Sequence, residues 1–230
     1  DNQPLAARMR PRNFDEFVGQ QHLVGEGKVL RNLIERDSIS SMIFWGPPGV
    51  GKTTLAKLVA NHLNRPLYTL SAVTSGVKDV REVIESARKH SLFQPTTSFL
   101  FIDEIHRFNK SQQDSLLGAV EQGIVTLIGA TTENPSFEVI SPLLSRCQVY
   151  ILKSMNDDEL QTLLMRAITT DEELSKRNIT ISQTAALFKF SGGDARKLLN
   201  ILDIIAGASD GDFDITDDYV TECLQQNIAL

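Results

Sequence analysis

The sequence predicts an α/β fold with a five-stranded parallel sheet, followed by a small all-α domain. Two observations carry this prediction. Short apolar runs alternate with helical patterns through the first 150 residues, and the strand signal stops after about Ser154. We therefore divide the chain into an α/β domain over residues 1–154 and a helical domain over residues 155–230. A chain of 230 residues is long enough to bury a sizeable core.

Five short runs in the first domain have the composition of strands that are buried on both faces. They are Met42–Trp45, Leu67–Leu70, Phe99–Ile102, Val125–Ile128 and Val149–Leu152. Between them, residues 77–87 and 116–120 repeat apolar side chains at helical spacing. Because buried strands that alternate with helices need crossover connections, we predict that the strands are parallel.

Four segments of the second domain have helical patterns. They are Asp157–Ile168, Ser182–Phe190, Ala195–Ala206 and Thr216–Gln225. Ser182 and Thr216 are the expected N-caps of the second and fourth helices, because their hydroxyl oxygens can accept hydrogen bonds from N–H groups of the first turn.

Charge is distributed unevenly along the chain. The net charge is −6, which by itself argues against a nucleic-acid-binding protein. Residues 1–155 carry 17 basic and 15 acidic side chains, whereas residues 156–230 carry 6 and 14. This asymmetry indicates two units with different surroundings, although a well-solvated acidic surface explains it equally well.

The apolar stretches are far too short to cross a bilayer, and the chain opens without a secretory signal. The two cysteines, Cys147 and Cys223, lie too far apart in sequence for a metal-binding knuckle and indicate reduced thiols. We therefore expect a protein of the cytoplasm that does not insert into a membrane.

A glycine-rich segment between the first predicted strand and a helix fits the pattern G-x-x-x-x-G-K-[ST]. Its glycines allow backbone N–H groups to turn toward phosphate oxygens, and the helix N-terminus adds a favourable dipole. Lys52 would reach the β- and γ-phosphates of ATP, and the Thr53 hydroxyl would bind Mg²⁺. We predict nucleotide contacts from Gly46, Pro47, Pro48, Gly49, Val50, Gly51, Lys52, Thr53 and Thr54.

Two acids follow the third predicted strand. A P-loop NTPase needs a carboxylate near its magnesium at the end of a neighbouring buried strand, and Asp103 meets this requirement. Glu104 is then positioned to activate the attacking water. His106 follows closely, but the remaining histidines give it no metal-ligand spacing, so we expect it to form hydrogen bonds beside Glu104.

The fourth predicted strand leads into Thr131, Thr132, Glu133 and Asn134. A polar side chain at this strand end would hold water against the γ-phosphate. Thr132 is the first candidate and Asn134 the second. The alternative is a loop of turn-forming residues without a role in the reaction.

Two arginines have distinctive settings. Arg146 lies in a Ser-Arg-Cys triplet before the fifth predicted strand, where a lone arginine is usually a surface charge. Arg196 follows Gly192-Gly-Asp-Ala and falls in the first turn of a helix, where a cation is unfavourable by roughly 0.3–1 kcal/mol. We expect either Asp194 or a bound phosphate to compensate this charge.

The order of these motifs resembles that of the AAA+ ATPases, and the resemblance covers essentially the whole chain. The motifs are the phosphate loop, the acidic strand end, the polar strand end, the Ser-Arg-Cys triplet and Gly-Asp-Ala-Arg. Residues 9–20 are similar to the stretch that lines the adenine pocket in the clamp-loader branch. The resemblance implies that the helical domain is a lid, with ATP and Mg²⁺ as cofactors. It also implies adenine contacts from Arg10, Pro11, Val18 and Gly19.

The same resemblance assigns roles to the two arginines. In the clamp-loader branch, the arginine of the Ser-Arg-Cys triplet acts on ATP bound to the neighbouring subunit, which implies this role for Arg146. The lid arginine contacts phosphate within its own subunit, which implies this role for Arg196.

Three longer stretches are similar to the replication-associated recombination protein A family. They are Ser71–Asp79, Arg107–Asp114 and Ala130–Glu138. The likeness is nearest to bacterial members and implies a DNA-dependent ATPase at stalled forks, DNA ends or gaps near the nucleoid. It also implies a link to single-strand-binding protein. Family members continue into a helical domain that forms tetramers, so we expect this chain to be the ATPase core of a longer protein.

Three other functions stay open. The Asp-Glu-Ile-His-Arg run also resembles Holliday-junction branch-migration motors, and the Ser-Arg-Cys triplet resembles clamp-loader subunits. A non-catalytic ATP-binding adaptor is the third alternative. Intact Lys52, Asp103, Glu104 and Arg146 argue against that adaptor.

Candidate DNA contacts come from four cations near the family stretches: Lys78, Arg81, Arg107 and Lys110. If they face a central channel of a ring, they would neutralise DNA phosphates. The alternative, of equal weight, is that these four side chains are ordinary charges on helix surfaces.

Overall fold

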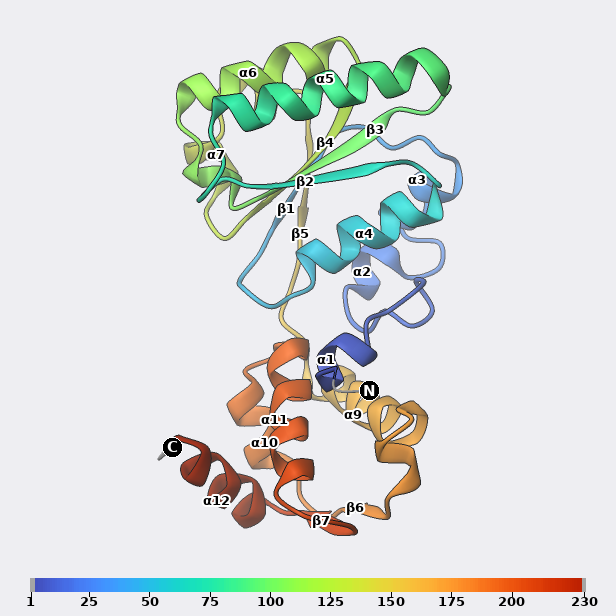
Figure 1. Cartoon of the computed structure of the whole chain (residues 1–230), viewed down its shortest axis with the longest axis vertical. Helices are drawn as coiled ribbons and strands as arrows, with labels where there is room; N and C mark the ends of the chain where they lie inside the picture. The colour runs from blue at the N-terminus through green and yellow to red at the C-terminus, as the bar shows by residue number, and fades with distance from the viewer. Residues whose placement is uncertain (1–2, 229–230) are drawn as a thin grey trace. The chain divides into compact units, whose positions relative to one another are not determined.

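The computed structural model describes residues 3–228 and divides into two compact units (Figure 1). The sheet unit runs from Gln20 to Lys153. The helical unit combines the segment that ends at Gly19 with the segment that begins at Ser154. Within the described residues, no helix has both the length and the apolar character needed to span a membrane.

The sheet unit contains a five-stranded sheet in the order β2-β3-β4-β1-β5, and all neighbouring strands are parallel. This confirms the predicted sheet. The strands are β1 (Met42–Trp45), β2 (Leu67–Ser71), β3 (Ser98–Asp103), β4 (Val125–Thr131) and β5 (Gln148–Ile151).

The prediction that all five strands are buried on both faces holds only for the three central ones. β1, β3 and β4 are almost wholly buried, but β2 is half-buried and β5 is largely exposed. In β5, Val149 is 39% and Ile151 is 53% exposed. The apolar pattern is the same, yet β2 and β5 are the edges of the sheet, where fewer neighbours cover the side chains.

Helices cover both faces of this sheet: α5 and α6 lie against one face, and α4 lies against the other (Figure 1). The helices of the unit are α2 (Gln21–Val24), α3 (Val29–Glu35), α4 (Lys52–His62), α5 (Val77–Phe93), α6 (Lys110–Glu121), α7 (Pro135–Glu138) and α8 (Ser141–Leu144), with a 3₁₀ turn η1 at Ile105–Arg107. Val80, Ala87 and Leu116 pack with strand residues in one core, as their helical spacing predicts.

The helical unit contains α1 (Leu5–Arg8), α9 (Asp157–Thr170), η2 (Leu174–Lys176), α10 (Ala185–Ser191), α11 (Ala195–Gly207) and α12 (Asp217–Ile228). It also contains a small parallel sheet of two strands, β6 (Ile179–Ile181) and β7 (Phe213–Ile215), which was not predicted. Strands of three residues are too short to produce a period that can be distinguished from a loop.

One of the two predicted N-caps is correct. The Thr216 hydroxyl accepts from the N–H of Tyr219 at 3.1 Å, as a cap of α12 should. The Ser182 prediction is wrong, because α10 begins at Ala185 and the Ser182 hydroxyl donates to the Asp214 carboxylate instead. The start of α10 receives a distant partner, since the Asp217 carboxylate accepts from the N–H of Ala186 at 2.8 Å.

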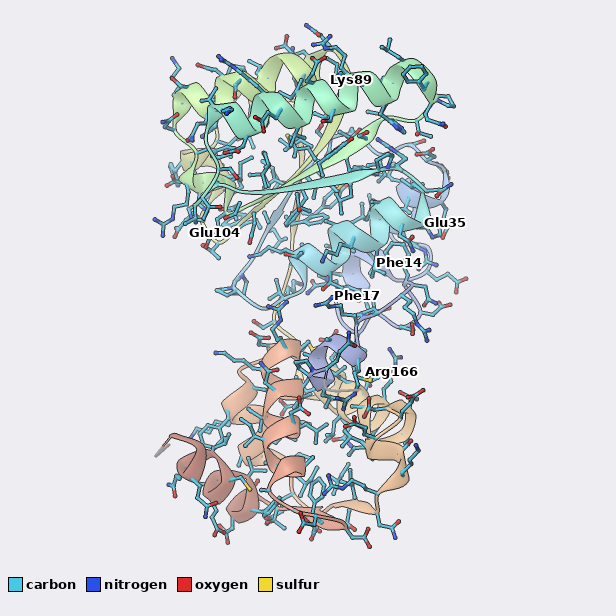
Figure 2. All side chains as sticks on the ribbon, in the orientation of Figure 1. Phe14, Phe17, Glu35, Lys89, Glu104 and Arg166 are labelled. Carbon is cyan, nitrogen blue, oxygen red and sulfur yellow. The ribbon has the colours of Figure 1, made fainter. Side chains whose placement is uncertain are left out.

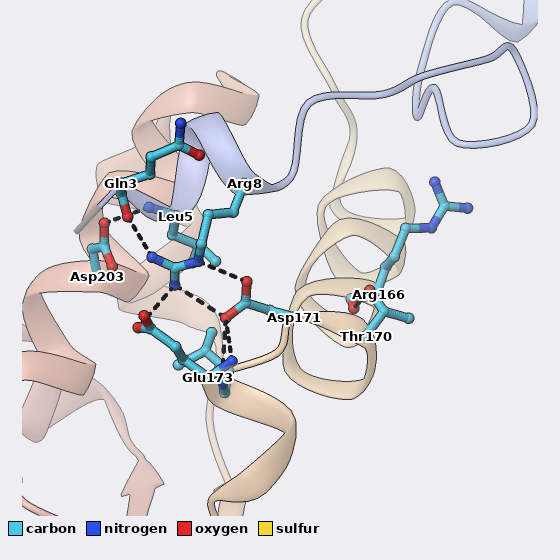
Figure 3. Close-up of polar contacts among 9 residues, drawn as sticks. Gln3, Leu5, Arg8, Arg166, Thr170, Asp171, Glu173 and Asp203 are labelled. Atoms are coloured by element: carbon cyan, nitrogen blue, oxygen red, sulfur yellow. Dashed lines mark hydrogen bonds and ion pairs between the residues drawn. The ribbon is translucent and has the colours of Figure 1, made fainter. Parts of the chain in front are cut away.

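The N-terminal segment belongs to the helical unit, whereas the sequence-based division assigned it to residues 1–154 of the α/β domain. Leu5 is fully buried among residues of α9 and α11, and its N–H donates to Asp203 at 2.8 Å. Arg8 forms two hydrogen bonds with the Asp171 carboxylate, at 2.9 and 3.0 Å (Figure 3). These partners lie more than 160 positions away in sequence, so local patterns carry no sign of them.

We expect Asp171→Asn to destabilise the helical unit by about 2–4 kcal/mol at pH 7, because it removes the buried counter-charge of the mostly buried Arg8 and leaves only the exposed Glu173. Burial alone would raise the pKa of Asp171, but hydrogen bonds from Arg8 and from the N–H groups of Leu174 and Glu173 bring it below its usual value. A carboxylate with a lowered pKa contributes stability above its unfolded pKa of about 3.9 and loses it as the pH falls through the folded value.

Urea unfolding at pH 7 and again below pH 4 measures this effect. The difference in free energy of unfolding between Asp171→Asn and wild type should shrink as the wild-type carboxylate becomes protonated. Glu173→Gln is the matched control, because Glu173 lies 3.3 Å from the same guanidinium but is 56% exposed. It should cost less than about 1 kcal/mol. Equal costs for the two variants would contradict the prediction.

Candidate nucleotide-binding site

The glycine-rich loop connects β1 to α4, as the motif requires, and its backbone lies close to neighbouring chain. A Cβ atom at Gly46 would lie 2.5 Å from the carbonyl oxygen of Leu152, so only glycine fits there. Gly51 precedes α4 with φ +94°, a left-handed conformation that favours glycine. The first N–H groups of α4 therefore follow directly on the loop, which is the arrangement that binds phosphate.

Lys52 is the first residue of α4, and its ammonium lies inside the loop. Nζ donates to the carbonyl oxygens of Gly46 at 2.5 Å and Pro47 at 3.2 Å. Burial lowers the pKa of Lys52, and the negative charges of Asp103 and Glu104 offset part of that effect. The two acids are therefore close enough to Lys52 to interact with its charge.

The two acids stand where β3 ends. Asp103 is the last residue of β3 and pairs in register with Ser71 of β2. Glu104 follows with φ 53° and ψ 48°, a left-handed conformation that costs a non-glycine residue of order 1 kcal/mol or more. Figure 2 shows Glu104 at the end of the sheet and Lys89 on the outer side of α5. Strained residues of this kind concentrate at active sites.

These donors suit magnesium. Mg²⁺ in nucleotide sites is held by one or two protein oxygens together with phosphate oxygens and water. The Thr53 hydroxyl at the start of α4 and the Asp103 carboxylate supply oxygens of this kind. Among residues 3–228, no group of three or more His, Cys, Asp or Glu is arranged to hold a metal ion.

The end of β4 contains a contact that sequence reasoning missed. Thr131 is buried, and its hydroxyl lies 3.0 Å from Nδ1 of His106 and accepts from the N–H of Glu133 at 2.9 Å. Asn134 uses its side chain to cap α7, accepting from Ser136 at 3.0 Å. The first candidate, Thr132, is half-buried at the same strand end and remains a prediction. The signal available in the sequence was that His106 lies just after one strand and Thr131 lies at the end of the strand beside it.

Arg146 lies at the opposite end of the sheet from the phosphate loop. It follows α8 and precedes β5, whose first residue Gln148 is paired with Met42 at the start of β1. The phosphate loop begins where β1 ends, and a four-residue strand spans roughly 13 Å at about 3.3 Å per residue. The guanidinium instead lies 3.2 Å from Glu121, the last residue of α6, on an exposed surface. The structure therefore separates Arg146 from the loop of its own subunit.

The neighbouring Cys147 is a protonated thiol at neutral pH, because burial raises its pKa to about 11. The described cysteines are both free, in agreement with the predicted reduced state.

The remaining predicted residues lie in the helical unit. Arg196 is exposed on the first turn of α11, and Asp194 caps this helix by accepting from the N–H of Lys197 at 3.1 Å. The four predicted adenine contacts lie in the N-terminal segment of the same unit: Arg10, Pro11, Val18 and Gly19. Val18 packs against the core of that unit, and Gly19 has φ +97°. Their contacts with nucleotide remain predictions.

Comparisons with known proteins agree with this geometry. The family model described as "ATPase family associated with various cellular activities (AAA)" matches residues 42–155. Replication-associated recombination protein A of Haemophilus influenzae is 48% identical over 210 residues, covering 90% of this chain and 47% of that protein. The protein of the same name from Escherichia coli K12 is 48% identical over 213 residues, covering 91% and 47%. The chain belongs to the replication-associated recombination protein A family of AAA+ ATPases.

The chain spans about half the length of these curated relatives. Among solved structures, the Thermotoga maritima RuvB Holliday junction branch migration motor aligns with a TM-score of 0.71 and 28% identity, covering 95% of this chain and 72% of that one. The family is therefore known from sequence, and the AAA+ fold is known from both sequence and structure.

Proposed function

We propose that the chain is the ATP-hydrolysing core of a protein of DNA replication and recombination. The observation that carries this proposal is the convergence of Lys52, Asp103 and Glu104 at the carboxyl ends of β1 and β3, the two strands that flank β4 in the sheet. Both acids are close enough to influence the pKa of the lysine. A phosphate-binding loop alone would serve a binding protein. A strained acid beside a half-buried acid at the end of a buried strand is expected of an enzyme that activates water.

In this proposal, Lys52 and the loop N–H groups hold the triphosphate, and Thr53 and Asp103 hold Mg²⁺, which neutralises charge that develops on the phosphates. Glu104 accepts a proton from the attacking water, and Thr132 orients that water. Arg196 contacts phosphate from the lid, and the N-terminal segment with Arg10, Pro11, Val18 and Gly19 contacts adenine.

The site is proposed to be completed by a second subunit. Arg146 is roughly a strand length away from the phosphate loop of its own chain, so its own nucleotide is out of reach. A neighbour in a ring or tetramer would present its Arg146 to this site. Self-association is therefore part of the proposed mechanism.

DNA is the proposed partner, at stalled forks, ends or gaps and together with single-strand-binding protein in the cytoplasm. Support comes from the names of the relatives and from the cations beside the site. Arg107 and Lys110 are exposed next to the acids of β3, whereas Lys78 lies 3.9 Å from Glu82, as an ordinary helix-surface charge does. Arg107 and Lys110 are therefore stronger candidates than Lys78.

The test is ATP turnover by the full-length protein with and without DNA that carries ends or gaps. Turnover should rise with DNA, and the rise should be lost in Arg107→Ala/Lys110→Ala while turnover without DNA is kept. Lys78→Ala is the matched control and should retain the stimulation. Stimulation that survives the double substitution would remove these residues as DNA contacts, and absence of any turnover would favour an ATP-binding adaptor. A Holliday-junction motor is the second candidate, favoured by the RuvB fold match, although identity to that structure is lower.

A further inference from the structure

Gln113 on α6 is a buried polar side chain whose partners are all backbone groups. It is only 3% exposed. Its amide nitrogen donates to the carbonyl oxygens of Phe108 at 3.0 Å and Glu138 at 2.9 Å, and its amide oxygen accepts from the N–H of Ile140 at 2.8 Å. Both amide hydrogens and the oxygen are used, so the side chain is a full hydrogen-bonding connector.

The three partners belong to two functional segments. Phe108 follows the acids of β3 and η1, whereas Glu138 and Ile140 flank the buried Val139 between α7 and α8. This second segment is irregular, so its backbone groups have few alternatives inside the protein. One glutamine therefore joins the loop after the catalytic acids to the segment that leads to Arg146.

The link from Ile140 to Arg146 is short and hydrogen-bonded along its length. Ile140 is the N-cap of α8, and its carbonyl accepts from the N–H groups of Leu143 at 3.1 Å and Leu144 at 2.9 Å. The N–H of Arg146 then donates to the carbonyl of Leu143 at 3.1 Å. Hydrogen bonds run without interruption from the Gln113 amide to the Arg146 backbone. At its other end, α6 contacts the Arg146 side chain directly through Glu121.

We propose that Gln113 is a positioning residue for Arg146. This inference rests on the proposed function, in which Arg146 acts on the nucleotide of a neighbouring subunit. By fixing the α7–α8 segment on α6, Gln113 sets where Arg146 stands at the amino end of the sheet. A misplacement of about 1 Å far from the chemistry can lower an enzymatic rate about 10²-fold, so a connector of this kind has a large effect.

Mixed subunits separate positioning from general stability. A donor subunit with Lys52→Ala presents Arg146 but lacks its own competent site, and an acceptor subunit with Arg146→Ala has an intact loop. In full-length protein, only their mixture should hydrolyse ATP. Adding Gln113→Ala to the donor should lower the turnover of the mixture at least about tenfold, with KM for ATP unchanged. The same substitution in the acceptor should change it less than about threefold.

Gln112→Ala is the matched control. Gln112 is the adjacent glutamine, and its side chain contacts Asn109 and the carbonyl of Ser75 rather than the α7–α8 segment. Its loss should have no donor-specific effect. Ile140→Pro is a second variant: it removes the N–H that donates to the Gln113 amide oxygen, together with an isoleucine side chain that packs against the core. The φ of −60° at Ile140 already suits proline. It should produce a smaller loss, again only in the donor.

The outcomes are distinguishable. An active parent mixture in which Gln113→Ala lowers turnover equally in donor and acceptor would overturn the positioning role and leave the proposed function intact. A parent mixture no more active than its separate subunits would overturn the action of Arg146 on a neighbour, and the Gln113 inference with it. If Gln113→Ala does not fold, a donor-specific loss in Ile140→Pro supports the inference and equal effects in both subunits overturn it.

Discussion

Glu104→Gln should lower ATP turnover by about 10²–10⁴-fold while ATP still binds, because the amide has the shape of the carboxylate but cannot accept a proton from water. The substitution leaves the left-handed backbone at this position and the neighbouring Asp103 in place. Fluorescent-nucleotide binding and single-turnover hydrolysis, measured on the same preparation, separate the two effects.

Asp103→Asn is the comparison for this experiment. Asp103 is proposed to hold Mg²⁺, so its loss should make turnover depend on a higher magnesium concentration, whereas Glu104→Gln should not respond to added magnesium. Hydrolysis by Glu104→Gln at a wild-type rate would remove Glu104 as the base.

Arg146→Ala should lower kcat by about 10³–10⁵-fold, which is the range measured when an arginine is supplied to a phosphoryl-transfer site by a partner. The reason is its place in the structure: it lies at the amino end of the sheet, where it cannot serve its own phosphate loop. The wild-type protein should accordingly gain specific activity as its concentration rises and subunits associate. Turnover assays across a dilution series measure both effects.

Glu121→Gln provides a control for Arg146. Glu121 pairs with Arg146 at 3.2 Å on an exposed surface, and such pairs contribute about 0–1 kcal/mol to stability. Arg146 must leave Glu121 to reach a neighbouring subunit, so the Glu121→Gln substitution should preserve turnover. Full activity that is independent of protein concentration would contradict the action of Arg146 between subunits.

The carboxyl edge of the sheet, with its glycine-rich loop and two acids, was predictable because its signals are local. The phosphate loop needs glycines and a lysine within eight residues, and the acids need only a buried strand before them. The central strands were predicted within a few residues for the same reason. Tertiary context decided the exposure of β5 and the true partner of Ser182, which depend on what lies beside them in space.

The polar stretch after the two acids shows, within one segment, what the sequence predicts and what only the structure reveals. Sequence similarity identified residues 107–114 as typical of the family, and made their cations Arg107 and Lys110 candidate DNA contacts. The structure reveals a different role for the glutamines of this stretch: Gln112 reaches the loop after β2, and Gln113 reaches the segment after β4. Hydrogen bonds between side chains and distant backbone leave no periodic trace in a sequence.

By itself, the sequence determined the AAA+ fold, the nucleotide-binding loop, the two acids and the family, since each depends on residues that are close in the chain. Only the tertiary structure decided that the N-terminal segment packs with the helical unit, that Arg146 stands a strand length from its own phosphate loop, and that one buried glutamine connects the acids to that arginine. The physical reason is the same in all three cases. Burial, strand register and long-range hydrogen bonds join residues that are remote in sequence, and no local pattern specifies such partners.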